Sequence, residues 1–277
     1  MLQSTVLEVA IGLVFCFASV ALIVSSINEA IASALKLRSK SLLSGVKSLL
    51  NDEKFTGLAL KLYNHALINP IDGGKAATEK DLKHKPSYIE SKQFAVALVE
   101  VLQSAGGGFA QLANDIDKVQ DPQLRQLLQG MYARAGGKIE NLRADLAGWF
   151  DNGMERVSGA YKRRTQLISL ILGLLIAAFL NIDSFHLFRS LWEHPILAAQ
   201  IGMPGTSDAG TALDGLKALP IGWKEVPALD AGLLLLFAGW LVTASSALFG
   251  APFWFDLLQR MVQLRGTGKK PDEDGKK

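Results

Sequence analysis

The sequence predicts an all-α membrane protein with three transmembrane helices and a cytoplasmic helical bundle. Long apolar runs lie near both ends of the chain, and another follows three consecutive cations, Lys162, Arg163 and Arg164. Between the first two runs, apolar side chains recur at steps of three and four residues, which is typical of helices with one buried face. That middle region almost lacks the alternation of β-branched residues that would favour strands.

Composition narrows the class of protein further. A net charge of +3 over 277 residues gives no reason to expect a general nucleic-acid binder. Cys16 is the single cysteine, so no intrachain disulfide can form, and no C-x-x-C motif occurs. The sequence predicts no catalytic residues, no metal ligands and no cofactor.

Residues 1–35 are predicted to form the first transmembrane helix. Val6 to Ile27 is about the length that crosses a ~30 Å hydrocarbon layer. Lys36, Arg38 and Lys40 follow this run and no Lys or Arg precedes it, so the N-terminus is expected outside and Lys36 inside. A cleaved signal peptide is the alternative, but it would carry its cations before the apolar run.

Residues 36–165 are predicted to form a cytoplasmic helical domain. Spacing of Leu and Val over 42–50 predicts that the first helix continues beyond the membrane. Residues 72–86 contain few apolar side chains and are expected to form a mobile loop. Gly106–Gly108 predicts a helix break, and Asp121 before Pro122 predicts a helix start.

One long helix is expected from Lys138 to Leu180, amphipathic at first and then wholly apolar. Its apolar part, residues 166–182, is the predicted second transmembrane helix, and the cations at 162–164 mark its cytoplasmic end. Gly173 is expected to allow another helix to approach closely.

The remaining chain completes the topology. Residues 183–230 are predicted to form an extracytoplasmic loop with an interfacial amphipathic helix, because this region is acidic and Phe and Trp recur at helical steps from Phe185. Residues 231–255 are the predicted third transmembrane helix, and residues 256–277 a cytoplasmic disordered tail.

Two blocks carry a resemblance to a known family: W-F-D-N-G-M-E-R-V-S-G-A-Y-K-R-R-T-Q at 149–166 and G-A-P-F-W-F-D-L-L at 250–258. With N-E-A-I-A at 28–32, they resemble a widespread, uncharacterised family of bacterial inner-membrane proteins. The resemblance covers most of the chain and implies a location in the bacterial inner (plasma) membrane. It implies no activity.

Ten residues in or next to these blocks are the candidates for structural or lipid contacts. We expect Asp151 to pair with Arg156, or Asp256 with the basic cluster, and the basic cluster to bind anionic lipid headgroups. The full set is Trp149, Asp151, Arg156, Tyr161, Lys162, Arg163, Arg164, Pro252, Trp254 and Asp256.

The function that the sequence favours is a membrane-anchored helical scaffold that docks a cytoplasmic protein partner or further copies of itself. An oligomeric pore or transport subunit is the alternative, with a thin polar lining of Ser19, Thr243, Ser245 and Ser246. A membrane-surface enzyme that uses Asp151, Glu155, Arg156 and Asp256 ranks last.

Overall fold

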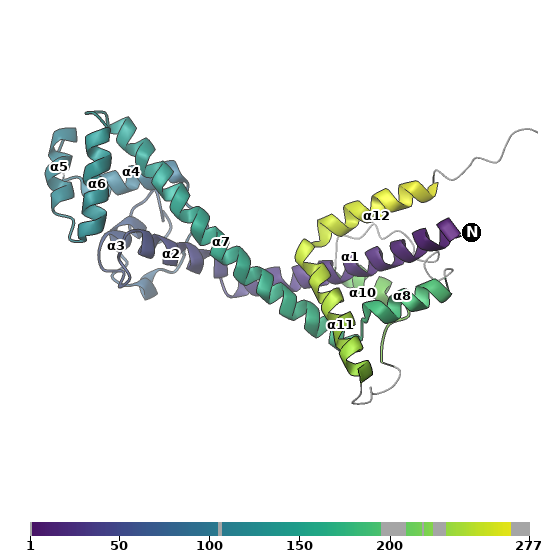
Figure 1. Cartoon of the computed structure of the whole chain (residues 1–277). Coiled ribbons are helices and arrows are strands. Elements are labelled where there is room, and N and C mark those ends of the chain that lie inside the picture. The colour runs from purple at the N-terminus through teal and green to yellow at the C-terminus, as the bar shows by residue number, and fades with distance from the viewer. Residues whose placement is uncertain (1, 105–106, 195–208, 218, 224–230, 267–277) are drawn as a thin grey trace, which may run out of the picture. The chain divides into compact units, whose positions relative to one another are not determined.

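The chain divides into two compact units, and every regular element in the part of the chain that is described is helical (Figure 1). The computed structural model describes residues 2–104, 107–194, 209–217, 219–223 and 231–266. Met1–Ile31 and Arg164–Lys277 make up one unit, here called the apolar unit. Ala32–Arg163 makes up the other, here called the polar unit.

The polar unit consists of short helices and the first part of a long one. Its elements are α2 (Leu37–Leu49), α3 (Leu58–Tyr63), the 3-10 turn η1 (Glu79–Asp81), α4 (Ser91–Leu102), α5 (Phe109–Asp117), α6 (Pro122–Arg134) and α7, which spans Ile139–Phe179 without interruption. The carboxylate of Asp121 accepts a hydrogen bond from the Leu124 amide at the start of α6, which confirms the predicted helix start.

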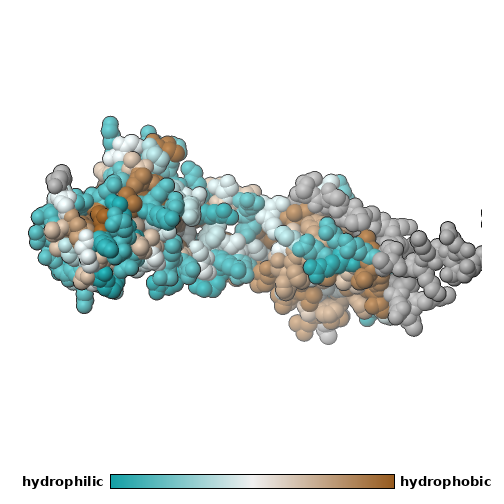
Figure 2. Space-filling model, turned by 90° about the horizontal axis from the view of Figure 1, so that it is seen from above, coloured by the Kyte–Doolittle hydropathy of each residue, from teal (hydrophilic) through white to brown (hydrophobic). Residues whose placement is uncertain are grey.

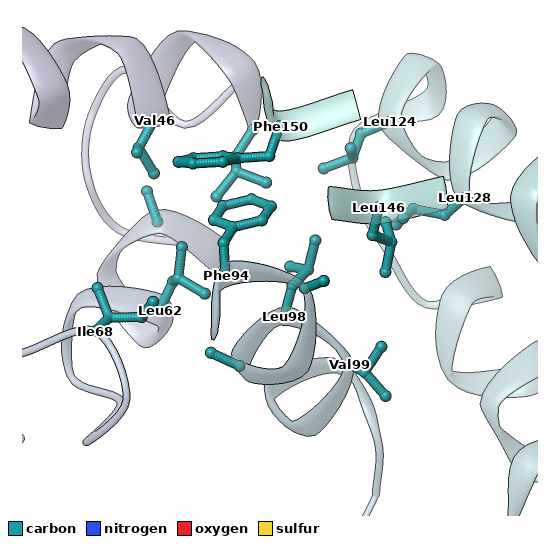
Figure 3. Packing of buried hydrophobic residues seen from close by; sticks show 14 of the residues in the cluster. Val46, Leu62, Ile68, Phe94, Leu98, Val99, Leu124, Leu128, Leu146 and Phe150 are labelled. Atoms are coloured by element: carbon teal, nitrogen blue, oxygen red, sulfur yellow. The ribbon is translucent and has the colours of Figure 1, made fainter. Parts of the chain in front are cut away.

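A single aliphatic and aromatic core holds the polar unit together. Phe94 on α4 and Phe150 on α7 stack with ring centroids 4.1 Å apart, and both side chains are buried (Figure 3). Leu98, Leu128 and Leu146 surround them from α4, α6 and α7. The heptad-like spacing of the apolar residues therefore places one face of each helix in a shared interior.

The apolar unit is built around α1 (Leu2–Ala34). The other elements are the rest of α7, α8 (Ser184–Glu193), α10 (Ala209–Lys217), α11 (Ala231–Ser246), the 3-10 turn η2 (Ala247–Phe249) and α12 (Ala251–Gly266). Consecutive residues of α1 such as Val14, Phe15 and Cys16 are all buried, so α1 is covered on most sides. Figure 2 shows hydrophobic residues gathered over this unit and hydrophilic ones over the polar unit.

Two helical segments, Thr5–Ala34 and Gly232–Phe249, are long and apolar enough to cross a membrane. A third span exists if α7 and α8, bent by 52° at their junction, together form one broken span. The protein is therefore an all-helical protein with two or three candidate transmembrane helices. Residues 166–182 do not form one straight helix, because α7 ends at Phe179 and Asn181 has a positive φ of 48°.

Close contacts between α7 and α11 explain the glycine in the apolar part of α7. A Cβ atom at Gly173 would lie 3.1 Å from the Cα atom and the carbonyl oxygen of Ala244. The predicted close approach of another helix at Gly173 is therefore confirmed.

Two local predictions were wrong. The first helix does not continue from α1 into α2, because Lys36 adopts a left-handed conformation with φ of 51° between them. The predicted disordered tail, 256–277, is helical as far as Gly266, because apolar residues at helical spacing pack α12 on the apolar core. Residues 267–277 of that tail lie outside the described residues.

The loop at 72–86, expected to be mobile, is attached to the polar unit at several points. The side chain of Asn64 exchanges two hydrogen bonds with the backbone of Ala76, and Lys47 on α2 forms an ion pair with Glu79 at 3.1 Å. Ala76 and Leu82 are buried in the core. The loop is therefore connected to the rest of the polar unit at these points, and its mobility stays a prediction.

Candidate functional site

A cavity in the polar unit lies where α2 and α7 separate. The two helices touch closely further along, since a Cβ atom at Gly45 would lie 2.7 Å from a methyl group of Val157. Toward the start of α2 the space between them is not filled, and the segment just before α4 forms its third side. Two small polar residues, Ser41 on α2 and Ser158 on α7, line this space.

The cavity has a volume of about 350 Å³, an apolar floor and a polar rim. Leu42, Phe150, Met154 and Val157 form the floor together with buried Ile89. The rim consists of Arg38, Ser41, Ser87, Tyr88, Asp151, Ser158 and Tyr161. It therefore offers one guanidinium, one carboxylate and five hydroxyl groups to a ligand that also has an apolar part.

Of the residues that the sequence singled out, Asp151 and Tyr161 line this cavity. Asp151 is exposed and Tyr161 is half-buried. Trp149 turns instead toward the core, where its ring lies 6.3 Å from that of Phe94. Trp149 therefore supports the floor of the cavity from behind.

The expected ion pair between Asp151 and Arg156 does not form in the described part of the chain. Five residues along an α-helix rotate a side chain by about 140°, so the two groups project from different faces of α7. Both are exposed. The alternative partners belong to different units. Asp256 is in the apolar unit, whereas Lys162 and Arg163 are in the polar unit, so this pairing stays a prediction.

The basic cluster is exposed throughout. Lys162, Arg163 and Arg164 all face solvent, and none of them forms an ion pair with another described residue. Exposed Lys36 and Lys40 flank Arg38 in the same way at the start of α2. The cavity rim at Arg38 and Tyr161 therefore has further cations next to it along both helices.

The second sequence block forms the turn between α11 and α12. Gly250 has φ of 78°, and α12 then begins with Ala251 and exposed Pro252. The indole N–H of Trp254 donates to the carbonyl of Ser246 at 2.7 Å, and its ring lies 5.1 Å from that of Phe17 on α1. Trp254 therefore satisfies a carbonyl that the end of α11 leaves open, while Asp256 is exposed.

Sequence reasoning missed Arg38 and Tyr88 as parts of a site. The side chain of Tyr88 is 75% exposed, although its neighbour Ile89 is buried. Arg38 was read only as a marker of membrane orientation. No local pattern could place Arg38, Tyr88 and Asp151 together, because they come from three separate stretches of chain.

A second, more open polar depression of about 670 Å³ lies around the ends of α2, α4 and α5. Its buried acids already have partners within the protein. Asp52 accepts from the amides of Thr56, Gly57 and Ala59. Hydrogen bonds from the side chain and backbone of Ser104, and then from Lys118, lower the pKa of Asp115 to about 2. These carboxylates hold loops in place and are not available to a ligand.

The junction of α7 and α8 is a third polar cluster, but its groups also bond to one another. The indole N–H of Trp240 donates to the side-chain oxygen of Asn181, and the side chain of Asn181 donates to the carbonyl of Gly222. The hydroxyl of Thr243 donates to the Ile182 carbonyl at 2.7 Å. These bonds satisfy polar groups at the irregular backbone between α7 and α8, so this cluster is structural.

No protein-family model, curated protein or solved structure matches the chain. The resemblance of the blocks at 149–166 and 250–258 to a bacterial inner-membrane family therefore stays a prediction.

Proposed function

We propose that the protein is a membrane-anchored helical docking protein of the bacterial inner membrane. In this proposal the apolar unit holds the chain in the bilayer, and the polar unit binds a cytoplasmic protein partner or a second copy of the chain. The N-terminus is outside and the C-terminus inside.

The observation that carries the proposal is the surface of the loop 64–90. Ile71 is 70% exposed and Tyr88 75% exposed, whereas Ala76, Leu82 and Ile89 from the same segment are buried. Hydrogen bonds between Asn64 and Ala76 and the ion pair of Lys47 on α2 with Glu79 connect this segment to the polar unit, so we expect the exposed side chains to be in place before a partner binds. Preorganised aromatic and aliphatic side chains are typical anchors of protein interfaces.

The pore alternative has no such support. Ser19, Thr243 and Ser246 are buried, and the hydroxyls of Thr243 and Ser246 donate to carbonyls within the apolar unit. Side chains used in this way offer little to a passing ion or solute.

Site-specific photo-crosslinking in native membranes tests the proposal. A photoreactive residue at Ile71 or Tyr88 should give a defined adduct, and the same residue at exposed Glu140 on α7 should not. An adduct of twice the chain mass identifies a second copy, and any other defined mass identifies a partner. If no position gives an adduct and the purified protein is monomeric, the docking function is wrong.

A further inference from the structure

The cationic end of the cavity lies a short stretch of chain from two apolar helices. Arg38 follows Ala34, the last residue of α1, by four residues, which span at most about 14 Å. Tyr161 precedes Leu167 by about 9 Å along the continuous helix α7. If α1 crosses the membrane, this end of the cavity is at the level of the lipid headgroups.

We propose that this cavity binds the headgroup of an anionic phospholipid, with the phosphate at Arg38 and a hydroxylated headgroup such as glycerol extending toward Asp151. The proposal uses the membrane location of α1 but does not depend on a docking partner. It concerns a bound lipid and so goes beyond the docking function.

The donors at the cationic end suit a phosphate. A guanidinium presents paired N–H groups that match two phosphate oxygens. The hydroxyls of Ser41, Ser158 and Tyr161 are close to it on the rim. The exposed cations on either side, among them Lys36 and Lys162, raise the local concentration of anionic lipid.

The acid on the rim sets which headgroup fits. Asp151 precedes Tyr161 by ten residues, about 15 Å along α7, so its charge is separated from the phosphate position. A carboxylate only accepts hydrogen bonds, so the far part of the headgroup must donate. The hydroxyls of phosphatidylglycerol and the ammonium of phosphatidylethanolamine can donate, whereas the quaternary ammonium of phosphatidylcholine cannot. Of the two donors, only phosphatidylglycerol carries the net negative charge that the flanking cations favour.

The size and floor of the cavity agree with a headgroup. About 350 Å³ is at the lower end of the range for small-molecule sites, roughly 300–1,000 Å³. That space holds a headgroup and the glycerol backbone but not two acyl chains, which would stay in the bilayer. Leu42 and Val157 on the floor would contact the glycerol carbons.

Lipid binding to the full chain, purified in neutral detergent and stripped of lipid, tests the site. Native mass spectrometry would count bound molecules during titration with phosphatidylglycerol, phosphatidylethanolamine, phosphatidylcholine and glycerol 3-phosphate. We expect phosphatidylglycerol to bind most tightly. Arg38→Gln should weaken phosphatidylglycerol binding roughly tenfold, which corresponds to the loss of about one charge-assisted hydrogen bond. The matched control Lys92→Gln removes an exposed cation from α4 and should change nothing.

A second pair of variants fills the space without changing charge. Ser158→Phe should block binding, and Asn152→Phe, at an exposed position on α7 outside the rim, should not. Circular dichroism would establish that both fold. If Ser158→Phe does not fold, the comparison of Arg38→Gln with Lys92→Gln decides alone. Arg38 is exposed, so its replacement should leave the fold intact.

Four results would overturn the proposal. Equal binding of phosphatidylcholine, or equal effects of Arg38→Gln and Lys92→Gln, would mean a non-specific lipid film. Tighter binding of phosphatidylethanolamine would mean that net negative charge is not recognised. Binding of glycerol 3-phosphate as tightly as phosphatidylglycerol would make the ligand a soluble phosphate. The crosslinking result at Ile71, which lies outside the cavity lining, is independent of all of these results.

Discussion

The two units treat apolar and polar side chains in opposite ways. In the polar unit most of the large apolar residues are buried, and the buried polar residues include the acids Asp52 and Asp115. In the apolar unit the buried polar residues of the described chain are all neutral, such as Asn28 and Thr243. Its exterior carries an apolar stripe on α7, formed by Leu167, Ile171, Leu175 and Phe179.

The single helix α7 shows both arrangements, since it buries large apolar side chains in one part and exposes them in another. The first half of α7 buries Leu142, Leu146 and Phe150, and its second half exposes Leu175 and Phe179 by 61% and 80%. The backbone is the same, so we propose that the surroundings differ, with water around the first half and lipid around the second. The cations at 162–164 mark the change.

The largest expected effect is loss of the polar core. Phe94→Ala should destabilise the polar unit by about 3–5 kcal/mol, because it removes a stacked ring from a filled interior. Hydrogen exchange of the α4 and α6 amides would measure the loss. Phe179→Ala, at an exposed position of the apolar unit, should leave those amides unchanged. Equal effects of the two variants would contradict the division into two units.

A charge placed on exposed apolar residues should distinguish lipid from water. Leu175→Arg should cost about 3 kcal/mol of membrane insertion, since a cation there would enter hydrocarbon. Ile71→Arg, at a similarly exposed position of the polar unit, should cost close to nothing. The fraction of each variant that resists alkaline extraction from membranes measures this. Full retention of Leu175→Arg would place that side of α7 in water.

Two glycines of α7 should respond in opposite directions to alanine. Gly173→Ala should destabilise the α7–α11 contact by about 1 kcal/mol, because the backbone of Ala244 has to move. A Cβ atom at Gly148 would have no neighbouring atom within 4 Å, so Gly148→Ala should stabilise the helix by about 0.5–1 kcal/mol. Thermal denaturation in detergent would show whether each variant is less or more stable than the unmodified protein. A stabilising Gly173→Ala would mean that the two helices are further apart.

The smallest effect should be confined to acid. The pKa of Asp115 is lowered from 3.8 to about 2, so its hydrogen bonds stabilise the polar unit fully above pH ~4. That stabilisation is lost as pH falls through about 2. The melting temperature of Asp115→Asn should therefore fall less between pH 4 and 2 than that of the unmodified protein. Parallel curves would show that Asp115 does not contribute.

Periodicity predicted most of the helices, because each helix buries one face. The long helix through 138–180 and the start at Asp121 follow from local sequence alone. The break at Lys36 could not be predicted, since neither glycine nor proline is present there and the left-handed turn depends on how α2 packs on α7. Helix α12 was missed because its apolar residues, such as Leu258, lead directly into a charged tail.

The candidate site was predicted only in part. Asp151 and Tyr161 stood out because they lie in a block next to the basic cluster. Their neighbours Arg38 and Tyr88 are more than sixty residues away in sequence, and only the packed structure brings them to one rim. The pairing of Asp151 with Arg156 failed because helix geometry sends the two side chains to different faces.

Thiol labelling in intact cells tests the central claim, that the polar unit lies in the cytoplasm and α8 on the other side of the membrane. Cys16, the single native cysteine, is buried, so an introduced cysteine would give the signal. Lys75→Cys and Glu193→Cys place thiols at exposed positions of the loop 72–86 and of α8. An impermeant reagent should label Glu193→Cys and spare Lys75→Cys until the cells are opened. Labelling of Lys75→Cys in intact cells, with Glu193→Cys protected, would contradict the account.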